Sequence, residues 1–304
     1  MDQIRGLIVL LGPTASGKTS LAVALAKKIN GAIISADSRQ VYRGMDIGTG
    51  KDLAIYGRMT PYLIDIRDAG DTYHIAHFQD DFQEALLTIQ SEGKIPILCG
   101  GTGLYIQSVL QGYIYTAVPR NDQLRSHLLD QDISALEKLF LSIPHSARFH
   151  ADMSTKKRLI RAIEIAYWLN THPETALVPP QPLEANVFGI SLPLVERRQR
   201  ITDRLKHRLE QGLIAEVEGL LTQGIPPDRL KFYGLEYKYV TAYLLGEIND
   251  TTLFTKLNTE IHRYAKRQMT YFRKMEKDGI AIHWLDGMKD EEQNCAEICH
   301  FLNG

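Results

Sequence analysis

Cysteine is scarce in this sequence, and long hydrophobic runs are missing from it. The 304 residues include only Cys99, Cys295 and Cys299, and no second cysteine or histidine pair stands at zinc-ligand spacing. No stretch approaches the roughly 18 apolar residues that a membrane helix needs. The apolar run at 7–11 is short and leads into a glycine-containing segment, unlike a signal peptide. We therefore expect a cytoplasmic protein without disulfides, zinc or a membrane segment.

A surplus of charge of either sign is also missing. Lysine and arginine number 35, aspartate and glutamate 36, and the formal net charge is -1. Taken alone, this balance argues weakly against a nucleic-acid partner, because backbone phosphates attract basic surfaces. The sequence nevertheless contains three local basic clusters. They are Arg197, Arg200, Arg204 and Arg208; Lys156, Lys157, Arg158 and Arg161; and Arg263, Lys266, Arg267, Arg273 and Lys274. Local clustering removes the objection from net charge.

Short apolar runs alternate with helical periodicity along the first hundred residues. Continuous apolar runs predict buried strands at 6–11, 32–35, 62–66 and 95–99. Apolar residues at helical spacing predict helices over 19–29 and 78–89. This alternation is typical of a parallel α/β sheet flanked by helices, in which ligands bind beyond the carboxyl ends of the strands.

The order of elements changes near Pro119. The periodicity from 121 to 170 is helical, prolines between 173 and 182 indicate a linker, and 187–192 predicts one more strand before a mostly helical remainder. Two domains follow from this order: an α/β core of residues 1–120 plus 186–304, and a helical insertion of residues 121–185.

The segment GPTASGKT matches a phosphate-binding loop, and it lies between a predicted strand and a predicted helix. Its glycines let backbone N–H groups curl around phosphate oxygens, and the helix N-terminus adds partial positive charge. Lys18 supplies a point charge, and Thr19 supplies a hydroxyl for Mg²⁺. The predicted diphosphate-binding residues are Gly12, Pro13, Thr14, Ala15, Ser16, Gly17, Lys18 and Thr19.

A carboxylate is missing where a P-loop ATPase normally holds its Mg²⁺, at the end of a later buried strand. The run at 97–101 ends in two glycines, and Asp65 is the alternative carboxylate. Asp37 follows the second predicted strand, so the topology brings it near the loop. It could accept a proton from a substrate or simply form a turn, and position alone leaves both roles open.

Four motifs together resemble the tRNA dimethylallyltransferase family, also called tRNA isopentenyltransferases. They are GPTASGKT at 12–19, DSRQVYRGMDIGT at 37–49, GGTGLY at 100–105 and KRQMTYFR at 266–273. The family usually carries a G-Y-R/K segment before Y-L-x-G-E, but here Leu235 and Glu236 separate Gly234 from Tyr237 and Lys238. The chain ends without a Cys/His finger, so it is similar to the shorter, bacterial members.

The resemblance implies a P-loop-kinase-like core that holds dimethylallyl diphosphate with Mg²⁺. It implies transfer of the dimethylallyl group to the exocyclic amine of the adenosine 3′ to the anticodon of tRNA, giving N6-isopentenyladenosine and pyrophosphate. The adenosine would be flipped into a channel, and the helical insertion would clamp the anticodon stem-loop. We expect a monomer.

The resemblance also implies roles for single residues. Asp37 would be the general base, Thr102 would lie in the reaction channel, and Lys18 and Thr19 would act on the diphosphate. Contacts with tRNA would come from three segments: Asp37, Ser38, Arg39 and Gln40; Lys157, Arg158, Leu159, Ile160 and Arg161; and Lys266, Arg267, Gln268 and Arg273.

Arginines at 200, 204 and 208 share one face if their segment is helical. A solvated helix face is the ordinary interpretation of such a stripe. Neutralisation of the leaving diphosphate is the alternative, and Arg204 is our candidate for it.

Three other functions share parts of this pattern. A small-molecule P-loop kinase shares the loop and the α/β core but needs neither the insertion nor the basic segment at 266–273. An adenylate isopentenyltransferase, which uses free AMP or ADP, shares the core chemistry but lacks a tRNA clamp. An RNA-binding GTPase-like regulator would need a guanine-reading N-K-x-D motif, which the sequence lacks.

Overall fold

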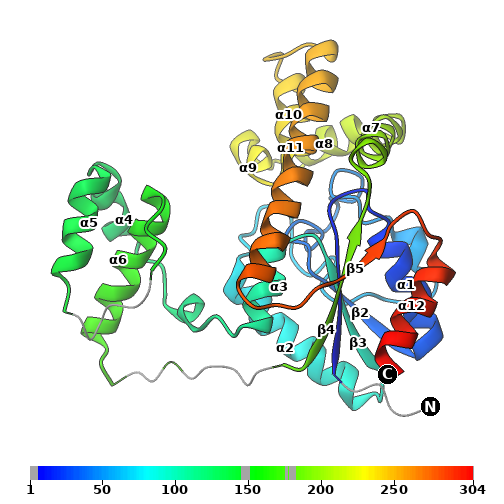
Figure 1. Cartoon of the computed structure of the whole chain (residues 1–304). Helices are drawn as coiled ribbons and strands as arrows, with labels where there is room; N and C mark the ends of the chain where they lie inside the picture. Colours follow the sequence, from blue (N-terminus) through cyan, green and yellow to red (C-terminus); the bar gives the residue numbers. More distant parts are fainter. Residues whose placement is uncertain (1–5, 145–150, 175–176, 178–182, 304) are drawn as a thin grey trace. The chain divides into compact units, whose positions relative to one another are not determined.

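The computed structural model describes residues 6–144, 151–174, 177 and 183–303. The chain divides into two compact units (Figure 1), a core unit of Met1–Gln111 with Pro182–Gly304 and a second unit of Gly112–Gln181. The second unit begins earlier than the insertion predicted at 121–185. Residues 145–150 and most of the proline-rich stretch lie outside the described residues.

The core unit is built on one parallel sheet, as predicted. Its strands are β1 (Leu7–Leu11), β2 (Gly31–Ser35), β3 (Ile95–Gly100), β4 (Ala185–Ser191) and β5 (His283–Asp286), in the spatial order β2-β3-β1-β4-β5. Strand β1 is central, so the loop that follows it lies in the middle of the carboxyl edge of the sheet. The α/β class predicted from the sequence is confirmed.

The prediction of a strand at 62–66 is wrong. Tyr62 forms a single parallel bridge with Ile34, and no strand continues from it. Leu63 and Asp65 have positive φ angles of 62° and 56°, which an extended strand does not accommodate. Strand β5 was not predicted, because its four residues are too few to show a period.

Helices cover both faces of the sheet (Figure 1). On one face, α1 (Lys18–Ile29) and α12 (Glu291–Asn303) share a core with Ile8 and Leu10 of β1. On the other, α2 (Ile75–Ser91), α3 (Gly103–Leu110) and α11 (Asp250–Lys277) pack against Val9 and Leu11. Alternate residues of β1 therefore hold opposite layers together. Cys99 and Cys295 are buried free cysteines, and Cys299 is a partly buried one.

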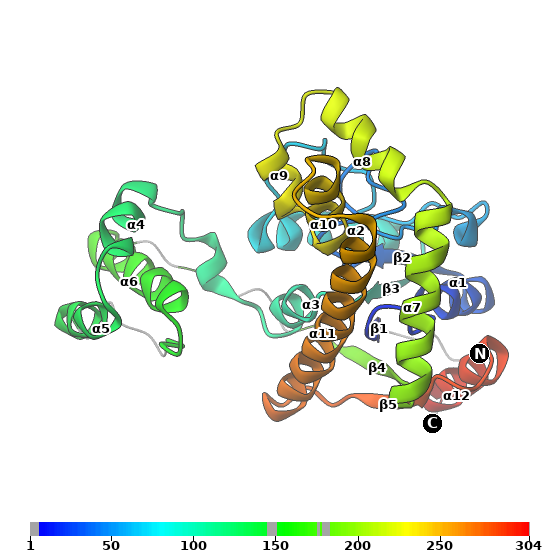
Figure 2. The same ribbon diagram turned by 90° about the horizontal axis from the view of Figure 1, so that it is seen from above.

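Four more helices stand beyond the carboxyl edge of the sheet. They are α7 (Leu194–Glu210), α8 (Leu213–Thr222), α9 (Pro227–Phe232) and α10 (Leu235–Leu244). Figure 2 shows the long helix α11 running past both α10 and α3, and it also contacts α7. Helix α11 thus joins these helices to the layer that covers the sheet.

The second unit is helical and has a core of its own. It contains η2 (Ile114–Ala117), α4 (Asp122–Leu129), α5 (Ile133–Ser142) and α6 (Lys156–Thr171). Side chains of Asn121, Asp132 and Thr155 each accept a backbone N–H in the first turn of one helix. Within the described residues of 121–170, the helical prediction is confirmed. No helix of the described chain combines the length and the apolarity needed to cross a membrane.

Candidate active site

The phosphate-binding loop occupies the turn between β1 and α1. Ala15 and Gly17 adopt left-handed φ angles of 61° and 85°, which curl the backbone of the loop. Helix α1 begins at Lys18 without a side-chain cap and without an acidic residue in its first turn. Its first N–H groups stay available to an anion, which the helix dipole also favours. The loop and the uncapped helix N-terminus therefore form a place where an anion can bind.

Asp37 is held in a defined turn at the end of β2. Its Oδ1 accepts the Arg39 N–H at 2.9 Å, and this hydrogen bond closes a turn. Turn formation was one of the two roles that the sequence left open for Asp37, beside acceptance of a substrate proton. Thr102 Oγ1 accepts the Ser38 N–H at 3.2 Å. Thr102 therefore supports the turn that carries Asp37, and its place in the reaction channel stays a prediction.

A cavity of 390 Å³ opens over the strand ends, within the size range of small-molecule sites. Thr14, Lys18, Thr19 and Asp37 line one part of it, and aromatic side chains of the helical edge line another. Those aromatic residues are Phe232, Tyr233 and Tyr264. Seven basic and two acidic side chains face the cavity, so its local charge is strongly positive although the chain as a whole carries -1.

Two arginines of α7 reach the cavity across Gly50. Arg204 donates to the Gly50 carbonyl at 3.2 Å and to Thr14 Oγ1 at 3.4 Å, and it pairs with Asp52 at 2.7 Å. Arg208 pairs with Glu236 at 3.1 Å, and its buried Nε has no partner among the described residues. Gly50 has a left-handed φ of 62°, and a Cβ built on it would lie within 2.4 Å of both guanidinium groups, so a side chain there would be strained and would displace the two arginines. The stripe at 200–208 is thus not simply a solvated face, because Arg204 and Arg208 turn toward the phosphate-binding loop.

Burial and neighbouring positive charges destabilise the protonated forms of Lys18 and Arg208. Burial lowers the pKa of Lys18 from its ordinary value, and the nearby Arg204 and Arg208 lower it further. Burial, with Arg204 beside it, lowers the pKa of Arg208 to about 10. Lys18 Nζ donates to the Pro13 carbonyl at 3.3 Å. An anionic ligand among these groups would reduce the repulsion between them and would offset the free-energy cost of burying their charges.

Gln268 connects α11 to the phosphate-binding loop. Its Oε1 accepts the Thr14 N–H at 2.9 Å, and its Nε2 donates to the Gly101 carbonyl at 3.0 Å. The side chain is only 7% exposed. Gln268 thus braces the loop against the segment that follows β3, and it also lines the cavity, so its expected contact with tRNA stays a prediction.

Glu216 of α8 is a residue that the sequence did not single out. Its carboxylate accepts the N–H groups of Asp46, Ile47 and Gly48 at 2.7 to 3.0 Å, and the Tyr237 hydroxyl donates to it at 2.6 Å. Burial raises the pKa of Tyr237 well above its ordinary value. Glu216 therefore fixes the loop that carries Gly50. No local motif marks it, because the backbone N–H groups that it accepts lie 168 to 170 residues away in the sequence.

Asp65 does not serve as the alternative metal carboxylate. It pairs with Lys51, whose side chain is fully buried and also bonds Asp46 at 2.5 Å and the Tyr42 carbonyl at 2.7 Å. Asp65 does not line the cavity. The carboxylate of Asp65 neutralises the buried Lys51, so it is not the carboxylate that would hold Mg²⁺.

The segment that departs from the family pattern forms part of the cavity wall. Gly234, at φ 140°, precedes α10, and Glu236 in its first turn pairs with Arg208. Burial raises the pKa of Glu236, and Arg208 opposes this shift. Tyr237 turns inward to Glu216, whereas Lys238 lines the cavity. Lys238 is therefore the basic residue of this segment that borders the cavity.

The residues expected to contact tRNA lie in different environments. Ser38, Arg39, Gln40 and Arg267 line the cavity, and Arg39 lies 5.2 Å from the ring centre of Phe232. Lys266 and Arg273 are exposed on α11 outside the cavity lining.

The segment 157–161 of the second unit serves partly to build that unit. Leu159 and Ile160 are 0% and 5% exposed and belong to its core, so contact by their side chains is ruled out. Arg161 donates to the carbonyls of Tyr115 and Val118 at 3.1 and 2.6 Å. Lys157 and Arg158 are exposed.

The donor set for a metal is sparse. Within the described ranges, no group of three or more histidine, cysteine, aspartate or glutamate side chains could hold an ion. Thr19 lines the cavity beside Lys18. This suits a Mg²⁺ ion held mainly by diphosphate oxygens and water, with one protein hydroxyl.

Comparisons with known proteins agree with this geometry. The family model described as IPP transferase matches residues 40–275. A protein of Porphyromonas gingivalis named tRNA dimethylallyltransferase 1 is 49% identical over 96% of this chain and 97% of its own length. One of the same name from Geotalea uraniireducens is 49% identical over 96% of each chain. The crystal structure of the full-length tRNA isopentenylpyrophosphate transferase from Bacillus halodurans is 32% identical, covers 98% of this chain and 96% of its own, and has a TM-score of 0.73.

Proposed function

The chain belongs to the IPP transferase family of prenyl-transferring enzymes, and on this premise we propose the reaction of its site. The enzyme transfers a dimethylallyl group from dimethylallyl diphosphate to an adenosine in tRNA. The acceptor is the exocyclic amine of the adenosine 3′ to the anticodon. The products are N6-isopentenyladenosine and pyrophosphate.

One observation carries this proposal. A single cavity contains a phosphate-binding loop with Lys18, two arginines of α7 beside that loop, and an aspartate held by its own turn. The donor diphosphate fits at Lys18, Arg204 and Arg208, and the acceptor amine fits beside Asp37. Aromatic residues on the helical wall, Phe232 and Tyr264, offer faces on which a flipped base can stack.

The chain's own residues supply the chemistry in two places. The adenine nitrogen forms a bond to the first carbon of the donor as the carbon–oxygen bond to the diphosphate breaks. Asp37 takes the amine proton, which a weak aromatic amine must lose as the bond forms. Lys18, Arg204, Arg208 and the amides of the phosphate-binding loop stabilise the charge that develops on the leaving diphosphate.

We infer that Mg²⁺ assists this step. Thr19 is the protein group placed to bind it, and the ion would add positive charge at the diphosphate. The sparse protein donor set supports a metal that arrives with the donor.

The large partner is tRNA, and its anticodon stem-loop is the part we assign to the protein. The positive cavity and the exposed Lys157, Arg158, Lys266 and Arg273 support contact with RNA phosphates. We assign the clamp to the helical unit, at residues 121–185. Cytoplasmic location and a monomeric state stay predictions.

The test is incubation of the purified protein with labelled dimethylallyl diphosphate, Mg²⁺ and either unmodified tRNA or AMP. Label on tRNA alone is the expected result. Label on AMP would instead indicate an adenylate isopentenyltransferase. Consumption of ATP without transfer to either acceptor would indicate a kinase and refute the role of Asp37.

A further inference from the structure

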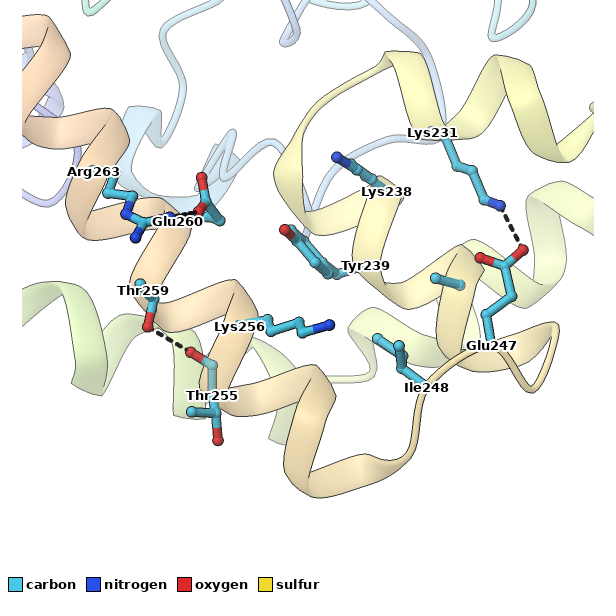
Figure 3. A pocket seen from close by; sticks show the side chains of 11 residues that line it. Lys231, Lys238, Tyr239, Glu247, Ile248, Thr255, Lys256, Thr259, Glu260 and Arg263 are labelled. Carbon is cyan, nitrogen blue, oxygen red and sulfur yellow. Dashed lines mark hydrogen bonds and ion pairs between the residues drawn. The ribbon is translucent and has the colours of Figure 1, made fainter.

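A second cavity lies beside the first, between α10 and α11, and we call it the α10–α11 groove (Figure 3). It measures 520 Å³ and its basic lining residues are Lys231, Lys238, Lys256 and Arg263. Lys231 and Lys238 also line the first cavity. The groove and the proposed active site therefore border the same two lysine side chains.

The charges of the groove are unevenly neutralised. Lys231 pairs with Glu247 at 2.6 Å, and Arg263 pairs with Glu260 at 2.5 Å. Lys238 and Lys256 form no ion pair with any residue that the structure describes. Figure 3 shows these two lysines on the two walls of the groove. Unpaired cations on facing walls attract an anionic chain that passes between them.

The spacing along α11 fits a phosphate backbone. Lys256 and Arg263 are seven residues apart on one helix, which is about 10 Å along its axis. This length lets the two side chains reach different phosphates of one passing strand. Tyr239 adds an aromatic face in the groove, with Lys238 Nζ 5.5 Å from its ring centre.

From this geometry we propose that the α10–α11 groove binds the ribose-phosphate strand next to the target adenosine. The base enters the first cavity, and its flanking nucleotides leave along α11 between Lys238 and Lys256. The ion pair of Arg263 with Glu260 borders the same path. That the bound strand belongs to tRNA rests on the proposed function. Binding of RNA to the groove is measured separately from transfer of the prenyl group.

The experiment measures equilibrium binding of an unmodified anticodon stem-loop RNA between about 50 and 200 mM salt. Lys256→Ala should weaken binding several-fold and lower the slope of log K against log salt by about 0.7, because one phosphate contact is lost. Lys277→Ala is the matched control, since Lys277 is exposed on the same helix outside the groove. Its binding should equal that of the wild type.

A second variant tests the opposite direction. Glu260→Gln removes a negative charge from the groove and frees Arg263, so RNA binding should tighten. Neither variant should change the affinity for dimethylallyl diphosphate, and thermal unfolding shows whether the fold is kept.

Three outcomes would overturn the proposal. The first is an affinity of Lys256→Ala for the stem-loop RNA within twofold of the wild type. The second is an affinity of Glu260→Gln no higher than that of the wild type. The third is that Lys256→Ala loses as much affinity for a duplex RNA of the same length without a loop as it loses for the stem-loop. The third result would show that the groove attracts any nucleic acid by charge alone. Displacement of the RNA by an acidic peptide would instead assign the groove to a protein partner. If RNA binds as predicted but receives no prenyl group, the proposed function fails while the groove proposal stands.

Discussion

At the scale of single residues, charge and burial decide the properties of the site. The chain balances its charges overall, yet seven basic side chains face one cavity. Arg204 and Arg208 each have a carboxylate partner, Asp52 and Glu236, which holds the guanidinium group at the cavity wall. A diphosphate would compete for these arginines with carboxylates already in place.

Asp37→Asn tests the general base. The amide keeps the oxygen that accepts the Arg39 N–H, so the turn should survive. Turnover should fall by about 10² to 10⁴, because proton acceptance is lost. Donor affinity, measured by calorimetry, should change by less than about twofold. Similar losses in turnover and donor affinity would show that Asp37 is structural.

Lys18 should make donor binding depend on pH. Its pKa is lowered by burial, so it loses its proton at a lower pH than an ordinary lysine. The protonated form binds diphosphate, and affinity should therefore fall as the pH rises through this lowered pKa. The measurement is the ratio of wild-type to Lys18→Met donor affinity at each pH, in which ionisation of the ligand cancels.

Lys206→Met provides the control for that titration, since Lys206 is exposed on α7. Its ratio to the wild type should stay flat over the same pH range. A flat ratio for Lys18→Met as well would show that Lys18 does not contribute its charge to donor binding.

At the scale of elements, contacts between distant segments shape the loops of the site. Glu216 of α8 collects three backbone N–H groups of the loop at 46–48, and Gln268 of α11 braces the phosphate-binding loop. Both side chains belong to helices, which are rigid supports for the loops that they hold.

Glu216→Gln should destabilise the protein by about 2 to 3 kcal/mol, because hydrogen bonds from three backbone N–H groups and from the Tyr237 hydroxyl lose their charged acceptor. Urea unfolding measures this loss. Glu218→Gln is the matched control, as Glu218 is exposed on the same helix, and its effect should stay within about 0.5 kcal/mol. Equal midpoints for the two variants would contradict the role of Glu216.

At the scale of the whole molecule, the chain has separate hydrophobic cores for its two units. Leu128, Leu136 and Leu159 belong to a core formed only by residues of the second unit. The sheet and its covering helices have cores formed only by the other unit. Each unit therefore has the means to stay folded by itself.

Replacing residues 112–181 with a short glycine-serine linker should leave the core unit folded. Cooperative thermal unfolding and donor affinity should be kept, because the donor cavity is lined only by the core unit. Affinity for the anticodon stem-loop should fall by more than about tenfold if this unit clamps RNA by several phosphate contacts. Unchanged RNA affinity would remove the clamp from the proposal.

The sequence alone determined the sheet class, the phosphate-binding loop and the helical character of 121–170. Each depends on neighbours in the chain: the apolar run before Gly12, the glycine spacing up to Lys18, and a regular apolar period. It failed at 62–66, where an apolar run suggested a strand but two left-handed residues prevent one.

Tertiary structure decided the rest of the site. The partners of Arg208, Glu216 and Gln268 lie between 21 and 254 residues away in sequence, and no local period records such distances. The same holds for Leu159 and Ile160, which share a motif with exposed Lys157 but face the core. Local spacing predicts which element a residue belongs to, whereas packing alone determines what its side chain touches.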